Sequence, residues 1–228
     1  GRFAANLDTP APGEFVRVDC APRATGGNGL ISAADFVQAG RYLAALDPLT
    51  PAGGPMAPAG GFVGFQPAGA PVSTVSAPNV SVAPASTFIV PVRLQAEGSE
   101  NALGLSIVFD PAKMSLASVA SGPDAASASL NLNTSLQGSG KLGVLLGLSP
   151  GQSFGVGAKE VLLLSFIAAG NAAGSGSVSF SDDVVLREVA NMNAETMSAS
   201  FVAGTVTFGV VTPPGPTLSF TRSGDTLL

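Results

Sequence analysis

The sequence predicts a mainly β fold, a Greek-key or jelly-roll-like β-sandwich, preceded by a small α-helical module. From Asn79 onward, short apolar segments alternate with Gly, Ser and Asn turns, as is typical of an all-β sandwich. Before that point, apolar residues recur at helical spacing between Asp35 and Leu46. Charged residues make up only 11% and aromatic residues 6%. A chain of 228 residues has room for one sizeable domain and one small one.

An internal repeat lies at the start of the chain. Gly1-Arg-Phe-Ala-Ala-Asn-Leu-Asp8 is echoed by Gly40-Arg-Tyr-Leu-Ala-Ala-Leu-Asp47. A proline follows each copy closely, as expected where a helix ends. We therefore expect residues 1–47 to form a loop–helix module, in which the first copy is the end of one helix and the second belongs to a complete unit.

The loop before this helix has the spacing of the second half of a calcium loop. An EF-hand-type loop supplies oxygens at positions 1, 3, 5, 7, 9 and 12 and has Gly at position 6. If Gly29 is position 6, oxygens at 5, 7, 9 and 12 follow in register, and an acid a few residues upstream replaces the missing first half. The predicted calcium ligands are Asp19, Asn28, Leu30 (through its carbonyl), Ser32 and Asp35.

Two readings of this loop stay open. In the alternative to calcium binding, the loop is a metal-free turn that caps the following helix through Ser32 or Asp35. Asp19 is then a solvated loop acid.

Residues 48–78 are rich in Pro, Gly and Ala, which predicts an extended, semi-stiff linker. The sandwich is expected at residues 79–209. Residues 210–228 read as a second linker followed by a terminal strand or hairpin at 217–228. The predicted strands are 80–82, 87–95, 103–109, 114–119, 127–132, 141–148, 160–168, 175–181, 184–188 and 198–208.

The residue inventory excludes several classes of function. The chain has no histidine and no tryptophan, which removes His-based catalysis and His-ligated metal sites. Cys20 has no second cysteine to pair with, so a buried small apolar residue is its expected role. Ten basic against fifteen acidic residues argue against nucleic-acid binding. The acids Asp182, Asp183 and Glu188 are interpreted as turn acids, so no enzyme activity is predicted.

Two glycosylation sequons occur, at Asn79 and at Asn133. Either is a candidate for a surface glycan. No apolar stretch is long enough for a membrane span.

Four segments of residues 79–209 carry a family resemblance. They are Val90-Pro-Val-Arg-Leu94, Leu105-Ser-Ile-Val-Phe-Asp-Pro-Ala-Lys-Met-Ser-Leu-Ala-Ser-Val119, Val161-Leu-Leu-Leu-Ser-Phe-Ile167 and Gly204-Thr-Val-Thr-Phe208. With these segments, residues 79–209 resemble the cohesin-type or related bacterial adhesion sandwiches.

Residues 19–47 are similar to one dockerin-type repeat, through Asn28-Gly29, Ile31, Ser32 and Asp35. The resemblance implies a calcium loop. It also places Gly40-Arg41 where that family has a pair used in partner recognition, and Ala33 and Ala34 where dockerins usually carry Ser or Thr for cohesin contact.

These resemblances imply a non-catalytic, extracellular or cell-surface bacterial protein that mediates calcium-supported adhesion or assembly. The segments 1–8 and 217–228 look incomplete by themselves, which suggests a homo-oligomer or fibre in which a neighbour completes them. The alternative is a carbohydrate-binding or anchoring module of a larger degradative enzyme.

Overall fold

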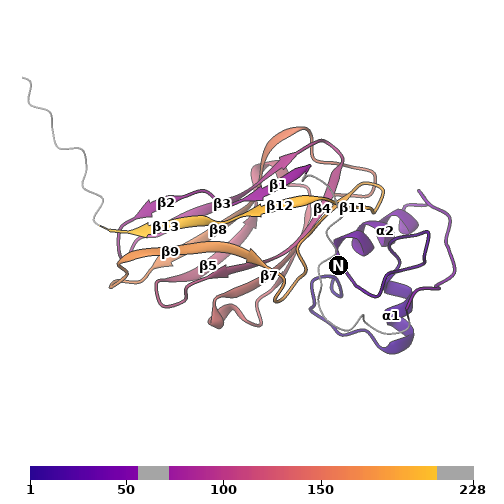
Figure 1. Ribbon diagram of the computed structural model, residues 1–228, viewed down its shortest axis with the longest axis horizontal. Helices are drawn as coiled ribbons and strands as arrows, with labels where there is room; N and C mark the ends of the chain where they lie inside the picture. The colour runs from indigo at the N-terminus through magenta and orange to yellow at the C-terminus, as the bar shows by residue number, and fades with distance from the viewer. Residues whose placement is uncertain (56–71, 210–228) are drawn as a thin grey trace, which may run out of the picture.

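Two packed β-sheets carry a small helical module at one end (Figure 1). The computed structural model describes residues 1–55 and 72–209. The segment 217–228, for which a terminal strand was predicted, lies outside the described residues, as does part of the predicted linker.

The first sheet has five strands. In spatial order these are β12 (Ala199–Val202), β1 (Ser73–Ser76), β3 (Thr87–Ala96), β8 (Gly157–Ala168) and β5 (Met114–Ser121). β3 and β8 pair antiparallel from Thr87–Ile167 to Ala96–Gly157, with one register shift after Val92. The β1–β12 pair is parallel.

The second sheet has a main path and a side branch. The path is β11 (Thr196–Met197), β10 (Glu188–Asn191), β4 (Glu100–Phe109), β9 (Gly174–Ser181), β13 (Gly204–Phe208) and β2 (Val80–Val82). On the other edge of β4 lie β7 (Lys141–Gly147) and then β6 (Ser129–Asn133). Two short 3₁₀ helices complete the sandwich, η1 (Pro123–Ala125) and η2 (Gln137–Ser139).

The main hydrophobic core lies between the two sheets and is built from alternate residues of their strands. Phe166 of β8 is fully buried there. Its ring stacks on Phe88 with centroids 5.6 Å apart and meets the edge of Phe109 at 5.2 Å. The predicted β-sandwich is confirmed.

β4 is buried on both of its faces. Leu103, Leu105 and Ile107 point into the main core. Ala102 belongs instead to a second apolar cluster on the opposite face, together with residues of the N-terminal module. Because β4 is covered on both sides, it fixes the position of the residues on its outer face, such as Ala102.

The N-terminal module contains two helices, α1 (Pro12–Val18) and α2 (Ala33–Leu43). α1 begins with a proline at its first position, and Glu14 accepts a hydrogen bond from the Ala11 N–H at 2.9 Å. α2 confirms the predicted helix, although it starts and ends a few residues earlier. Its Asp35 reaches back to the Ser32 N–H at 2.9 Å, which closes the first turn.

The internal repeat is visible in the backbone. In the first copy the Leu7 N–H donates to the Arg2 carbonyl, and in the second the Leu46 N–H donates to the Arg41 carbonyl, both at 2.9 Å. Asn6 and Ala45 have φ of 53° and 55°. Each copy is also closed by an Arg–Asp ion pair. Residues 1–8 form turns rather than the predicted helix end, and they pack on their own chain.

Two predicted boundaries were wrong. Ser73–Ser76, assigned to the linker 48–78, is β1. Val184–Glu188, predicted as one strand, is mostly loop, and only Glu188 belongs to β10.

The predicted strand 198–208 divides into β12 and β13, which lie in different sheets. Gly204 allows this crossing, because a Cβ there would stand 2.3 Å from the Pro78 carbonyl oxygen.

Phe166→Ala is expected to destabilise the sandwich by about 3–5 kcal/mol, because it empties a fully buried site beside the rings of Phe88 and Phe109. Its neighbour Ile167, 45% exposed on the outer face of the same strand, is the matched control. Ile167→Ala should cost less than about 1 kcal/mol. Chemical denaturation measures both, and similar losses would contradict this assignment of the core.

Candidate functional site

The outer face of β4, β7 and β10 is covered by the N-terminal module. We call this surface the docked face and define it by Ala102, Gly104, Leu145, Gly147, Glu188 and Ala190. Ala33, Ala34 and Val37 of α2 are buried in the second apolar cluster with Ala102 and Leu145. The module and the sandwich therefore share an apolar interface.

Two glycines let the module approach the sheet closely. A Cβ on Gly147 would lie 2.2 Å from Cε1 of Phe36, so the Phe36 ring occupies the space above that glycine. A Cβ on Gly104 would lie 2.8 Å from the Leu186 carbonyl oxygen and 3.7 Å from Cβ of Ala33. Larger side chains at either position would hold α2 away from the sheet.

A buried carboxylate of the sandwich meets the first turn of α2. Oε2 of Glu188 accepts a hydrogen bond from the Ala34 N–H at 2.9 Å, and its Oε1 accepts one from the Thr196 hydroxyl. The first N–H groups of a helix have no partner within the helix, and the helix dipole favours an anion there. Glu188 thus provides a polar, directional contact inside an otherwise apolar interface.

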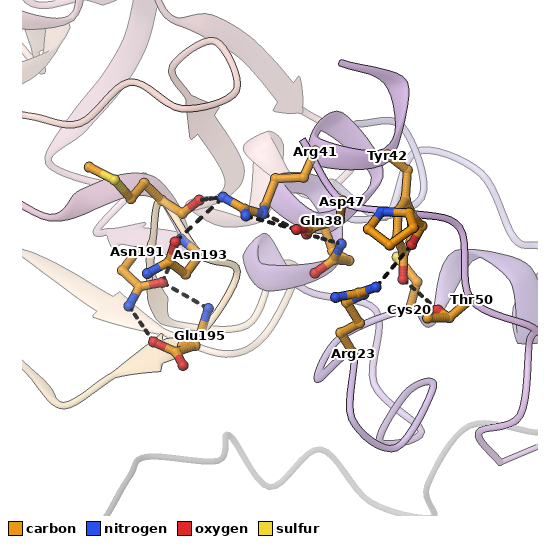
Figure 2. Close-up of polar contacts among 12 residues, drawn as sticks. Cys20, Arg23, Gln38, Arg41, Tyr42, Asp47, Thr50, Asn191, Asn193 and Glu195 are labelled. Atoms are coloured by element: carbon orange, nitrogen blue, oxygen red, sulfur yellow. Dashed lines mark hydrogen bonds and ion pairs between the residues drawn. The ribbon is translucent and has the colours of Figure 1, made fainter. Parts of the chain in front are cut away.

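Arg41 extends from the end of α2 to the turn between β10 and β11 (Figure 2). Its Nη1 donates to the Met192 carbonyl at 2.6 Å. Its Nε and Nη2 pair with the carboxylate of Asp47 at 2.7 and 2.9 Å, and Gln38 donates to the same carboxylate at 2.9 Å. The guanidinium is therefore fixed within the module and directed at the sandwich.

The turn at residues 1–8 supplies the third polar contact. The side-chain amide of Asn133 donates to the carbonyls of Ala5 and Asn6 at 3.2 and 2.6 Å. Asn6 in turn donates to the Val184 carbonyl at 3.3 Å. Residues 1–8, which were predicted to be completed by a neighbouring copy, therefore have a partner in the sandwich of their own chain.

The same contacts correct the prediction for the Asn133 sequon. Asn133 is only 5% exposed and its amide nitrogen is already bonded to the module, so it is not a surface acceptor in this arrangement. Asn79 is exposed, and its side-chain oxygen accepts a hydrogen bond from the Thr205 N–H at 2.8 Å. A glycan at Asn79 stays a prediction.

The predicted calcium loop closes on two buried carboxylates. Asp19 accepts hydrogen bonds from the N–H groups of Asn28 and Gly29 at 2.9 and 2.6 Å. Gly27 is required beside it, because its φ is +125° and a Cβ would stand 2.6 Å from Cγ of Asp19. Asp19 is therefore not a solvated loop acid. Burial raises its pKa, although the two N–H donors act in the opposite direction.

Asp35 holds the other end of the loop. Its Oδ1 accepts from the N–H groups of Cys20 and Ala21 at 2.7 and 2.8 Å, and its Oδ2 from that of Ser32. Burial raises the pKa of Asp35 to about 7; the N–H donors lower it, and the nearby charge of Asp19 raises it further. Burial and the same two charges raise the pKa of the Cys20 thiol to about 12.

The remaining predicted ligands lie close to the docked face. Asn28, Leu30 and Ser32 line a small hollow together with Leu186 and Glu188. The side-chain oxygen of Asn28 accepts the Leu30 N–H at 2.9 Å. Within residues 1–55 and 72–209, no group of three or more His, Cys, Asp or Glu side chains could hold a metal ion. A calcium ion would have to replace the loop's own N–H···carboxylate bonds.

Sequence reasoning missed the residues of the sandwich that contact the module. Glu188 was interpreted as a turn acid, and nothing in its local pattern separates it from Asp182, which pairs with Arg187 at 2.8 Å. The alternation of Gly143, Leu145 and Gly147 with core residues of β7 is the one available signal, since small residues on an outer face permit close packing.

Comparison with known proteins identifies the sandwich. A family profile described as "Cohesin domain" matches residues 73–208. No curated protein sequence matches the chain. In the described part of the chain, none of the helices has the length and apolar character needed to cross a membrane.

Solved structures share the fold at low sequence identity. A cohesin from scaffoldin B of Acetivibrio cellulolyticus, in complex with a Cel5 dockerin mutant, is 20% identical with a TM-score of 0.52, and covers 60% of this chain and 99% of that one. The Coh-OlpA–Doc918 complex from Clostridium thermocellum is 16% identical with a TM-score of 0.52, over 60% and 98%. A non-cellulosomal cohesin from Archaeoglobus fulgidus is 15% identical with a TM-score of 0.50, over 60% and 91%.

The raised pKa of Asp35 predicts a specific pH dependence. The folded state keeps a proton on Asp35 up to about pH 7, whereas the unfolded chain releases it near the ordinary value of 3.8. The contribution of this group to stability is therefore present at low pH and is lost as pH rises toward 7. The free energy of unfolding of the wild type, relative to Asp35→Asn, should fall between about pH 4 and pH 7.

Denaturation of both proteins across this range measures the effect. Asp47, whose pKa the Arg41 pair lowers to about 2, is common to both proteins and titrates below the window. A difference between the two proteins that stays constant from pH 4 to 7 would contradict the assignment.

Proposed function

This chain belongs to the cohesin family, since the matching profile covers more than half of it, and we propose that its docked face is a protein-binding surface occupied by the chain's own dockerin-like module. Cohesin domains are non-catalytic protein–protein interaction modules. The proposal gives the domain a partner within its own chain and makes residues 1–47 and the sandwich a closed pair.

One observation carries the proposal. The dockerin resemblance assigns partner contact to positions 33, 34 and 41. Here Ala33 and Ala34 are buried in the second apolar cluster, and Arg41 donates to the Met192 carbonyl of the sandwich. The positions at which dockerins contact a cohesin thus lie against the sandwich of the same chain, although Ala33 and Ala34 stand where dockerins usually carry Ser or Thr.

The solved relatives support this assignment. Two of the similar structures are described as complexes of a cohesin with a dockerin. A third is described as non-cellulosomal, so a cohesin fold is also found in a protein described as standing outside that assembly. We propose the same kind of pairing for this chain, within one polypeptide and at the bacterial cell surface or outside the cell.

The alternative function, carbohydrate binding, has no comparable support. Of the described phenylalanines, Phe88, Phe109, Phe166 and Phe208 pack on one another in or against the main core and offer no flat platform to a sugar.

Cleavage between the two parts tests the proposal. A protease site placed within residues 56–71 of the full chain lets the folded protein be cut after purification. The two fragments should co-elute in size-exclusion chromatography, because the interface is apolar and has three polar contacts. Fragments that separate would contradict the proposal.

The Gly147→Leu variant sharpens this test. The new side chain occupies the position of the Phe36 ring, so association of the cut fragments should weaken by about 1–3 kcal/mol, roughly five- to a hundredfold. Gly138→Leu is the matched control, since a Cβ at Gly138 has nothing within 4 Å. Equal fragment affinities in the two variants would place the interface elsewhere.

We also propose that calcium stabilises the loop in a second arrangement, in which Asp19, Asn28, Leu30, Ser32 and Asp35 turn their oxygens toward the ion. Calcium should then raise the melting temperature of the wild type by a few degrees, and EDTA should reverse the shift. Asp19→Asn, which keeps the side-chain shape but removes the charge, should abolish the calcium effect. An unchanged melting temperature would leave the loop as a metal-free helix cap.

A further inference from the structure

The interface described above is formed by two separate parts of the chain. On the module side it uses residues 1–8 and α2, and on the sandwich side β4, β7, β10 and the neighbouring turns. The residues that follow the module contact the module itself. The Pro48 carbonyl accepts from Arg23 at 3.1 Å, Thr50 bonds to Tyr42 at 2.6 Å, and the Gly54 N–H donates to Gly26 at 3.0 Å.

Among the described residues, the contacts of the docked face named above therefore do not involve the connection between the two parts. The connection covers residues 56–71, which as an extended chain reach at most about 55 Å. A span of this size reaches a neighbouring molecule as well as the same one. We propose, on the basis of the proposed function, that the module of one copy docks on the docked face of a second copy, so that the chain assembles by exchanging its N-terminal module.

A second copy of this chain is the occupant that the face fits. The docked face needs a helix whose first turn carries small residues and offers an N–H to Glu188. It also needs an aromatic ring over Gly147 and a cation for the Met192 carbonyl. It also needs a turn whose carbonyls accept from Asn133. The N-terminal module combines all four features, and every copy of the chain carries it.

Docking between two copies then competes with docking within one chain, and the protein concentration decides which of the two dominates. A covalent connection gives the module of the same chain a high effective concentration, on the order of millimolar for a short linker. At low protein concentration the closed monomer dominates, and pairs of chains form when that internal contact is prevented or when the protein is very concentrated.

Two complementary full-length variants test the exchange. In the first, Gly147→Leu blocks the face and leaves the module intact. In the second, Ala34→Glu blocks the module, because Ala34 is 4% exposed and its N–H touches the carboxylate of Glu188, while the face stays intact. In either variant alone, every copy lacks the same half of the interface, the docked face in the first and the module in the second. Each variant alone should therefore sediment as a monomer.

Mixed in equal amounts, the two variants should form a one-to-one complex in analytical ultracentrifugation, in which the first variant's module occupies the second variant's face. Gly138→Leu mixed with Ala39→Glu is the matched control, since Gly138 has an open surrounding and Ala39 is an exposed alanine of the same helix. That mixture should stay monomeric. Circular dichroism checks that all four variants are folded, and Glu188→Lys replaces Gly147→Leu as the blocked face if that variant unfolds.

The outcomes separate this inference from the function on which it rests. A mixture that stays monomeric up to roughly millimolar concentration, while the cut wild-type fragments still co-elute, overturns exchange alone. Cut fragments that separate overturn both. A one-to-one complex that forms from the control pair as readily as from the complementary pair, at concentrations far below the millimolar range, would place the contact outside the docked face and overturn exchange through the module.

Discussion

The burial of β4 on both faces is the constraint on which the rest of the structure depends. Its inner residues, such as Leu105, belong to the main core, and its outer residue Ala102 belongs to the cluster shared with the module. From Ala102 to Phe109 the strand carries apolar or small residues, and it cannot expose either side to water without cost. The sandwich supplies one cover by folding, and the module supplies the other by docking.

The interface combines apolar burial with few, well-placed polar contacts. The apolar part is rich in alanines and glycines, which allow close approach but specify little by shape, together with Val37, Leu145 and Phe36. Three polar groups set the orientation of the module on the sandwich. They are Glu188 at the first turn of α2, Arg41 on the Met192 carbonyl and Asn133 on the turn at 1–8. A different placement of the module would break each of these hydrogen bonds, and the loss of a hydrogen bond in a buried interface is costly. The polar contacts therefore fix the orientation that the apolar surface leaves free.

The sequence predicts the sandwich and α2 well, because period-2 alternation and helical spacing are properties of single segments. It misses what depends on distant partners. β1 has the sequence Ser-Thr-Val-Ser, which by itself gives no clear strand pattern, and it becomes a strand because it pairs with β3 and β12. The alternation from Ala199 to Phe208 runs on unbroken, so nothing local shows that the chain changes sheets. Asp19 and Asp35, which were predicted as calcium ligands, accept hydrogen bonds from backbone N–H groups of the loop, and their spacing in the sequence cannot distinguish a cation from such groups as the partner.

The hydrogen bonds of Asn133 have a consequence for producing this protein. The nitrogen that donates to Ala5 and Asn6 is the same atom to which an oligosaccharyltransferase would attach a sugar. Docking and modification of this residue therefore exclude each other. In a host whose secretory pathway glycosylates such sequons during translocation, before the chain has folded, a sugar on Asn133 would keep residues 1–8 off the sandwich. A host without that machinery is the appropriate source of the closed form.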